Sequence, residues 1–290
     1  MPLQQLVEYF NDRLEWEHHS NFRPFFLHDG VVQGLFGPIR IGSELAPLRQ
    51  TLRLSAITGY AARLNVTAAE MPHMQSHELA QLVSLPAQQG VNPESIVNFD
   101  RLARTVHMLN FLPLSHLDDF LQLDVDPRHI LGVKKDHGAY FQDVIIKCGL
   151  QPKNIIITMS VYSLYAAYYE VLLKGLENYR GRHYRLALKF DYHALGSSAM
   201  DLISILAPDF VCLQSAHLAN IQDNQSLEKL NRLNTLTHAQ GGQTIMLHVN
   251  ERKIATLARK TGFNLVQGDY YEQSGSQDFN QSPRSAAGGR

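Results

Sequence analysis

The sequence has little of several features that would narrow its class. Only two cysteines, Cys148 and Cys212, occur in 290 residues, too few for a disulfide framework, which indicates a reducing compartment. Charged residues make up 18%, and 26 Lys and Arg against 27 Asp and Glu leave a net charge of −1. No field of one sign covers the molecule, which argues against general nucleic-acid binding. The 44% share of hydrophobic residues is typical of a globular chain and excludes a disordered one.

Long apolar segments are missing as well. The N-terminus, MPLQQLVEYFNDRLEWEHH, has neither the basic start nor the apolar run of a signal peptide. The longest apolar runs, such as 155–159, are of strand length, far below the roughly 20 residues of a membrane helix. Gly-rich phosphate loops and the Gly-x-Ser-x-Gly nucleophile motif are also absent. We therefore expect a cytoplasmic protein without a membrane segment.

What the chain does contain, from about residue 50, is a regular alternation of strand and helix patterns. The apolar runs cover 52–64, 120–125, 154–159, 184–190, 209–214, 243–249 and 264–268. Helical patterns cover 76–84, 97–110, 136–149, 161–178, 196–206, 225–239 and 251–261. Strands that alternate with helices predict parallel pairing with helical crossovers. Seven repeats favour an α/β fold of the (β/α) barrel type, with one further strand hidden in the N-terminal or C-terminal sequence.

Both ends of the chain differ from this pattern. Apolar residues at helical spacing predict a helix over 3–17, and Asp29-Gly30 between apolar stretches predicts a small hairpin. The tail from Ser274 is rich in Ser, Gly and Gln, which is typical of disorder. The expected organisation is an N-terminal extension at 1–50, a barrel at 51–273 and a disordered tail at 274–290.

Few metal ligands follow the predicted strands. The carboxylates at the carboxyl ends are Asp124, Asp126 and Asp191, whereas a two-metal site needs several converging anionic ligands. Asp124 and Asp191 could hold one ion at most. His73 and His77 are four residues apart and could share a metal, although a polar helical face is the simpler interpretation. We expect neither a metal nor a cofactor.

Several segments, taken in order, resemble the EAL domain, a family of cyclic di-GMP phosphodiesterases built as a modified TIM barrel. They are ITGYAARL, LQLDVDPR, CGLQPKNIIITMS, YRLALKFDYHALGSSAMDLISILAPDFVCLQSAHL and QGGQTIMLHVNERKIATLARKTGFNLVQGDYYE. The resemblance covers about residues 50–273. It implies a modified TIM barrel of EAL type, here with an added N-terminal helix and hairpin.

The resemblance also marks where this chain departs from the family. The family's site falls on eight positions, most of them substituted: Ala61, Asp124, Thr158, Asp191, Cys212, Leu247, Asn250 and Gln267. The family's paired aspartates fall near Asp191-Tyr192, or near Lys189-Phe190 in another register. Apolar and neutral residues cannot replace the carboxylates that hold the cations of a metal-activated water. The resemblance therefore implies a degenerate, catalytically inactive member with no catalytic residues.

Two functions remain open. In the first, the chain is a regulator that binds another, unknown protein and is linked to cyclic di-GMP signalling. In the second, it is a cyclic di-GMP receptor without hydrolysis. The receptor is less favoured because the family's phosphate-binding arginine aligns with Asn65, and Arg63 is expected on the other face of its strand. Family members often dimerise, so a homodimer is a further expectation.

A stripe of aromatic residues offers a candidate interface. Tyr162, Tyr165, Tyr168 and Tyr169 recur at helical spacing. Tyrosines are enriched at protein interfaces, but the same spacing is typical of a helix packed against a barrel. The stripe is therefore interpreted either as an interface or as part of the core.

Overall fold

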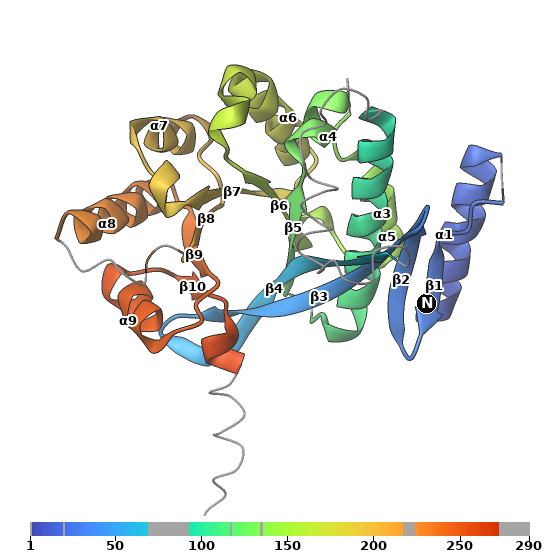
Figure 1. The fold of residues 1–290 in the computed structure, drawn as a ribbon, viewed down its shortest axis with the longest axis horizontal. Coiled ribbons are helices and arrows are strands. Elements are labelled where there is room, and N and C mark those ends of the chain that lie inside the picture. The colour runs from blue at the N-terminus through green and yellow to red at the C-terminus, as the bar shows by residue number, and fades with distance from the viewer. Residues whose placement is uncertain are drawn as a thin grey trace, which may run out of the picture.

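The computed structural model describes residues 2–19, 21–68, 93–116, 118–133, 136–216, 218 and 224–272. Eight strands form a closed barrel in the order β3-β10-β9-β8-β7-β6-β5-β4, and β3 also pairs with β4 (Figure 1). Their bounds are β3 Ile39–Gln50, β4 Arg53–Ala68, β5 Phe120–Val125, β6 Ile155–Ser160, β7 Arg185–Asp191, β8 Phe210–Gln214, β9 Gln243–Leu247 and β10 Leu265–Val266. The barrel predicted from the alternating pattern is confirmed.

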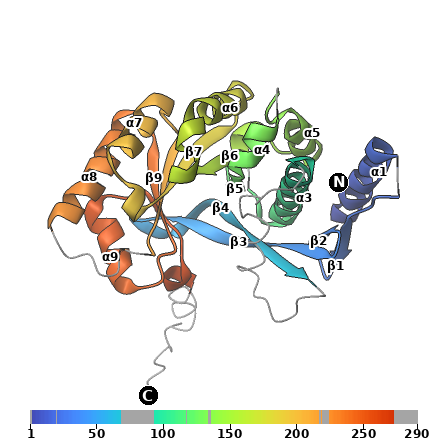
Figure 2. The ribbon, with the colours of Figure 1, turned by 45° about the horizontal axis from the view of Figure 1, so that its top comes forward.

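The helices pack around the outside of this barrel (Figure 2). They are α3 Pro93–Phe111, α4 Pro127–Gly132, α5 Ala139–Lys147, α6 Tyr169–Gly181, α7 Ser197–Leu206, α8 Asn224–Ala239 and α9 Arg252–Thr261. Short 3-10 helices are η1 Leu112–Leu114, η2 Pro152–Asn154, η3 Ser163–Tyr168 and η4 Tyr192–Ala194. In α9, for example, Ile254, Leu257 and Ala258 are buried while the charged residues lie on the opposite face, as expected of a surface helix. Within the parts of the chain that the structure describes, no helix combines the length and apolar character needed to cross a membrane.

The N-terminal piece is a helix and a hairpin beside the barrel. Helix α1 spans Leu3–His18, and β1 Phe25–His28 pairs antiparallel with β2 Val31–Phe36. Asp29 and Gly30 both have positive φ, 50° and 78°, the conformation that a tight two-residue hairpin turn requires. The predicted helix and hairpin are thus confirmed.

The barrel begins earlier than residue 51, because β3 lies inside it. This strand pairs antiparallel with β4 along almost its whole length and with β10 at its end. Ala46 and Leu48 are buried, which fixes the strand in the barrel wall. The barrel is therefore mixed rather than all parallel, and the missing eighth strand is Ile39–Gln50. The helix predicted at 76–84, the pair His73 and His77, and the tail at 274–290 lie outside the described residues.

Inside the barrel, side chains fill the amino-terminal half. The rings of Phe120 and Phe210 lie 5.4 Å apart between centroids and form a floor. Gly59 makes room for this floor, since a Cβ there would lie 2.3 Å from the carbonyl oxygen of Phe120. Small and aliphatic residues continue the core above it, among them Ile156, Ala187 and Ile245. The interior is a packed core, so chemistry is confined to the two ends of the barrel.

Candidate functional site

The carboxyl ends of the strands surround the mouth of the barrel. Alternate residues of each strand point inward, so a residue two positions after an inward-facing core residue also faces the inside of the barrel, closer to the mouth. Strand β5 thus contributes Gln122 and Asp124, and β7 contributes Lys189 and Asp191, with β6 between them. The structure therefore places Lys189, a cation, on the inner wall, where the sequence interpretation had it only in an alternative register of β7.

An ion pair joins Lys189 to Asp124 across the mouth. The Lys189 ammonium donates to Oδ2 of Asp124. The lysine side chain is only 12% exposed, whereas that of Asp124 is 54% exposed. Burial alone would lower the pKa of Lys189, but the carboxylate of Asp124 outweighs it and the pKa is raised. At neutral pH this wall therefore holds a charged ammonium beside the carboxylate of Asp124.

Apart from Asp191 at the end of β7, the other predicted positions on the inner wall are uncharged. Ala61, Thr158 and Leu247 are buried, and Ala61 and Leu247 pack within the interior cluster. Cys212 is fully buried, and its Sγ accepts a hydrogen bond from Nε2 of Gln122 at 3.4 Å. Burial raises the pKa of the Cys212 thiol to about 12, so the group stays protonated and is a poor nucleophile at neutral pH.

Three buried polar atoms around the mouth have no hydrogen-bond partner among the described residues. They are Oε1 of Gln122, Oγ1 of Thr158 and Nε2 of Gln267. Gln267 is nevertheless oriented, because its Oε1 accepts from the backbone N–H of His248 at 3.3 Å. Buried polar groups are normally paired with protein or water, so these atoms are available to a water or a ligand.

Asn250 and Arg63 lie differently from expectation. Asn250 follows β9 and is exposed, and its Oδ1 accepts from the backbone N–H of Asp269 at 3.2 Å. Arg63 shares the inward face of β4 with Ala61, since the two residues are two apart in a regular part of the strand. The expectation that Arg63 points to the other face is wrong. Its guanidinium lies 3.3 Å from the carboxylate of Glu44 on β3.

The tyrosine stripe is divided between surface and core. Tyr162 and Tyr168 are exposed, whereas Tyr165 and Tyr169 are partly buried against the core. The hydroxyl of Tyr169 donates to the backbone carbonyl of Tyr162 at 2.9 Å. The stripe is therefore half packing and half surface, and only its exposed half can contact a partner directly.

Metal ligands do not gather in the described part of the chain. No three side chains of His, Cys, Asp or Glu come together there in a way that could hold an ion. Of the predicted carboxylates, Asp124 is already paired with Lys189 and Asp126 with Arg128, while Asp191 lies at the end of β7. The sequence interpretation gave Lys189 only in an alternative register and missed Gln122 as a wall residue; the period-two pattern running from Phe120 and Ala187 would have indicated both.

Comparison with known proteins extends the description of the fold. No protein-family model matches the chain, and no curated protein matches it by sequence. Among solved structures, Klebsiella pneumoniae BlrP1 in a manganese and cyclic di-GMP complex aligns at a TM-score of 0.63 and 17% identity, over 81% of this chain and 56% of BlrP1. Bacillus subtilis YkuI, with an EAL domain, in complex with the substrate cyclic di-GMP and calcium, gives 0.60 and 18%, over 79% and 54%.

A third similar structure is limited to the domain itself. The Xanthomonas citri FimX EAL domain in complex with cyclic di-GMP aligns at a TM-score of 0.62 and 15% identity, over 92% of both chains. This chain thus spans just over half the length of BlrP1 and YkuI, and nearly all of the FimX domain. At these identities the likeness establishes the fold, a barrel of the EAL type.

Proposed function

We propose that this chain is a catalytically inactive protein of EAL type that regulates another protein by binding it, in connection with cyclic di-GMP signalling. The observation that carries the proposal is the ion pair between Lys189 and Asp124 in the barrel mouth. A metal-dependent hydrolase needs anionic side chains there to hold its cations. In this chain the accessible carboxylate of β5 already has an ammonium as its partner.

The residues around the pair support the same conclusion. A metal-bound water needs ligands from several strands, but Ala61, Thr158 and Leu247 supply no charge. Cys212 stands where the resemblance puts a lysine, and a protonated thiol cannot stabilise the charge of a phosphodiester transition state. The fold is thus retained without the groups that the reaction requires, which favours a role through surface recognition.

Hydrolysis can be tested directly. Purified protein is incubated with cyclic di-GMP and Mn²⁺ or Mg²⁺, and the linear product is followed by chromatography, with an active EAL phosphodiesterase assayed in parallel. We expect no product above the buffer blank. Sustained turnover that depends on the added metal would refute the inactive assignment.

A non-hydrolysing cyclic di-GMP receptor is the second candidate, and two observations favour it. Arg63 lies on the inward face of β4, where its guanidinium could meet a phosphate, and Nε2 of Gln267 is an unpartnered donor among the described residues. Calorimetry with cyclic di-GMP, with and without Mg²⁺, separates the two candidates. The regulator predicts no heat of binding. Binding that is lost in Arg63→Ala but kept in Arg53→Ala, at the exposed start of the same strand, would establish the receptor.

The exposed tyrosines are the first surface to test for a protein partner. Tyr162→Ala and Tyr168→Ala remove exposed rings and should leave the fold intact, whereas Tyr165→Ala would also disturb packing. Affinity capture from the native cell, with recovered proteins compared between wild type and these variants, is the measurement. Loss of one specific protein with unchanged circular dichroism supports this surface. Identical recovery from both would exclude it.

A further inference from the structure

The amino end of the barrel, opposite the mouth, contains an open hollow of about 940 Å³. Beneath the Phe120 and Phe210 floor, residues from the starts of β4, β5, β7, β8 and β9 and from the α9–β10 loop surround it. Two guanidiniums line it, those of Arg185 and Arg259. Neither is in an ion pair within the described parts of the chain. This hollow is the first of three features that converge at this end.

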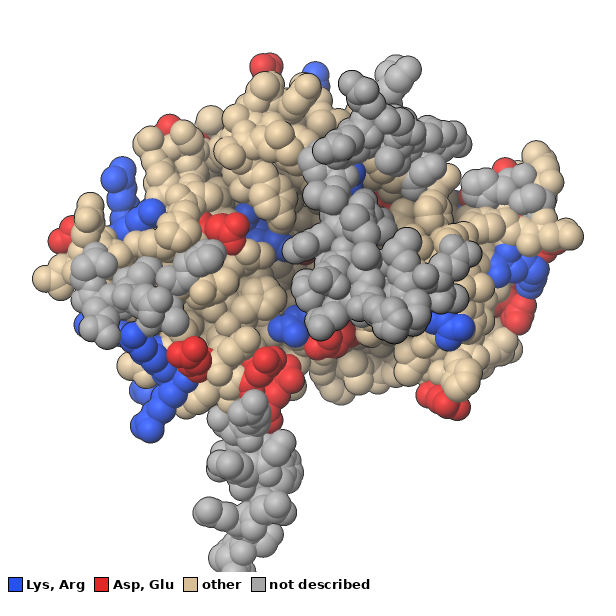
Figure 3. All heavy atoms as spheres, viewed as in Figure 1, with Lys and Arg blue, Asp and Glu red and all other residues tan. Residues whose placement is uncertain are grey.

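The second feature is the basic face of α9. Arg252, Lys253, Arg259 and Lys260 are all exposed. At 3.6 residues per turn, residues seven positions apart lie on the same side of a helix, so Arg252 lies in line with Arg259, and Lys253 with Lys260. The two members of each pair are about 10 Å apart along the helix axis. Figure 3 shows Lys and Arg atoms gathered over this helix at the lower left. Because Arg259 also lines the hollow, the basic face runs directly into it.

The third feature is an apolar rim. Leu52, in the turn between β3 and β4, is 85% exposed, and Leu54 and Ile57 are exposed as well. Leu52 and Ile57 line the same hollow as Arg259. The turn is fixed beside the α9–β10 loop, since the N–H of Thr51 donates to the carbonyl of Asn264 at 2.9 Å, and both views place the two segments side by side (Figures 1 and 2). Exposed apolar residues that cluster beside a cavity can form a binding surface.

We propose that the amino end of the barrel is a docking site for an acidic segment of a partner protein that carries apolar side chains beside its carboxylates. The carboxylates would contact Arg259 and Lys260 on α9, and the apolar side chains would cover Leu52 and Ile57. The inference rests on the proposed function in that the partner is a protein. It places contact at the end of the barrel away from the mouth.

The lining of the hollow favours a protein over a nucleic acid or a membrane. Asp118, Asp119 and Asp209 line the same hollow, and they would repel the phosphates of either alternative. Two of these carboxylates are fixed by backbone N–H groups, Asp119 by that of His116 at 3.0 Å and Asp209 by that of Leu186 at 2.8 Å. A peptide of mixed sequence can place its acidic residues against α9 and its neutral residues against these aspartates. A nucleic acid or an anionic membrane carries negative charge along its whole length and cannot avoid them.

The test begins with an unbiased selection. Random dodecapeptides displayed on phage are selected against the full chain, and the selected peptides are synthesised and measured by fluorescence anisotropy. The proposal predicts a consensus of Asp or Glu next to Leu, Ile or Phe. It predicts about tenfold weaker binding to Arg259→Glu/Lys260→Glu and to Leu52→Ser. A single-stranded oligonucleotide and phosphatidylserine vesicles serve as the other anionic probes.

Matched controls lie elsewhere on the exposed surface. Lys174→Glu on α6 reverses an exposed cation, and Ile205→Ser on α7 removes an exposed aliphatic residue. Both should change the affinity by less than about twofold. The proposal is overturned by a selection without an acidic and apolar consensus, by controls that weaken binding as much as the test variants, or by tighter binding of the oligonucleotide or vesicles. None of these outcomes depends on cyclic di-GMP, so this failure is distinguishable from failure of the proposed function.

Discussion

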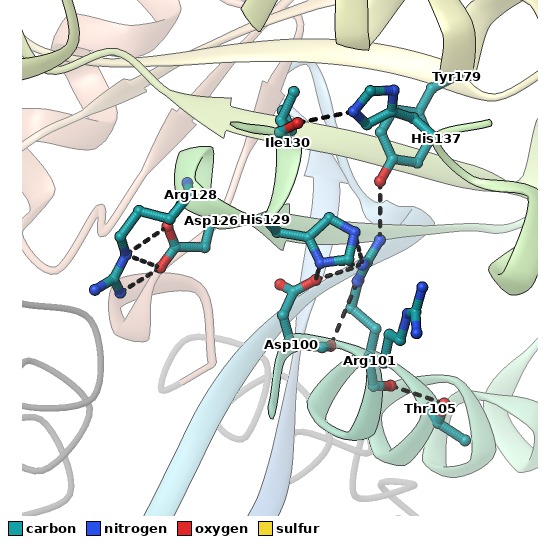
Figure 4. A network of polar contacts seen from close by, with 10 residues as sticks. Asp100, Arg101, Thr105, Asp126, Arg128, His129, Ile130, His137 and Tyr179 are labelled. Carbon is teal, nitrogen blue, oxygen red and sulfur yellow. Dashed lines mark hydrogen bonds and ion pairs between the residues drawn. The ribbon is translucent and has the colours of Figure 1, made fainter. Parts of the chain in front are cut away.

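A buried charge network between α3, α4 and α6 allows one prediction to be worked out in detail. The carboxylate of Asp100 contacts the guanidinium of Arg104 and lies 2.8 Å from Nδ1 of His129 (Figure 4). Arg104 is 2% exposed and also approaches the hydroxyl of Tyr179 at 3.4 Å. Burial lowers the pKa of His129, so its imidazole is neutral at pH 7 and Arg104 is the charged partner of Asp100.

The perturbation is Asp100→Asn, which keeps the shape and removes the charge. It leaves the Arg104 guanidinium buried without its carboxylate, and breaking such a pair costs roughly 3–5 kcal/mol. The matched control is Asp126→Asn, in which the ion pair with Arg128 is more exposed and asparagine still caps α4. The control should cost about 1 kcal/mol or less.

Urea unfolding followed by far-ultraviolet circular dichroism measures both variants. The reasoning is refuted if Asp100→Asn costs less than about 1 kcal/mol or no more than the control. A double variant, Asp100→Leu/Arg104→Met, separates charge from packing. Removing both charges should recover most of the loss, because no unpaired ion is then left in the interior. A double variant as unstable as the single one would attribute the effect to packing.

Three further predictions follow from buried groups. Burial alone would raise the pKa of Asp100, but the charge of Arg104 outweighs it and lowers the pKa to about 2. The carboxylate therefore stabilises the fold above pH 4, and this contribution should be lost as the pH falls from about 4 to 2. The Asp100→Asn variant lacks the carboxylate and should not show this loss, which acid titrations of the unfolding free energy of both proteins test. Cys212 should be alkylated by iodoacetamide at pH 8 only after denaturation, and modification of the native protein, seen by mass spectrometry, would contradict its burial. Gly138→Ala would set a Cβ 2.7 Å from the Tyr179 ring at a φ of +81°, and should lower the melting temperature more than Gly149→Ala, which has φ +79° but open space; equal shifts would contradict this.

Most of the fold could be predicted because the strands are short and apolar and the helices amphipathic. The run at 120–125 coincides with β5, and the other predicted strands within the described residues overlap the observed ones. Strand β3 could not be predicted in the same way. Its sequence, IRIGSELAPLRQ, contains Pro47 and three charged residues, so it is not a continuous apolar run. It also pairs antiparallel with β4 through a short turn, so no crossover helix separates the two strands in the sequence.

The site was less predictable because it depends on which face of each strand turns inward. Aligning motifs gave Thr158 and Cys212 as positions, but only the structure shows that the side chain of Lys189, which pairs in register with Ser160, reaches Asp124 two strands away. A one-residue change of register reverses the face of every side chain, and such a change decides whether a cation enters the mouth. Arg63 illustrates the same dependence, since it shares the face of Ala61.

The charges at the two ends of the barrel differ in exposure, so added salt should weaken binding at one end more than at the other. In the mouth, Lys189, whose side chain is only 12% exposed, has its counter-charge within the chain, so added salt should affect this pair less than a fully exposed one. At the amino end, Arg259 and Lys260 of α9 are exposed, and exposed charges more than a Debye length apart, about 10 Å at 0.1 M, are largely screened. A partner held at the amino end should therefore dissociate as the salt concentration rises, whereas a ligand enclosed in the mouth should be retained. Measuring the salt dependence of a captured partner would thus identify which end of the barrel it contacts before any residue is changed.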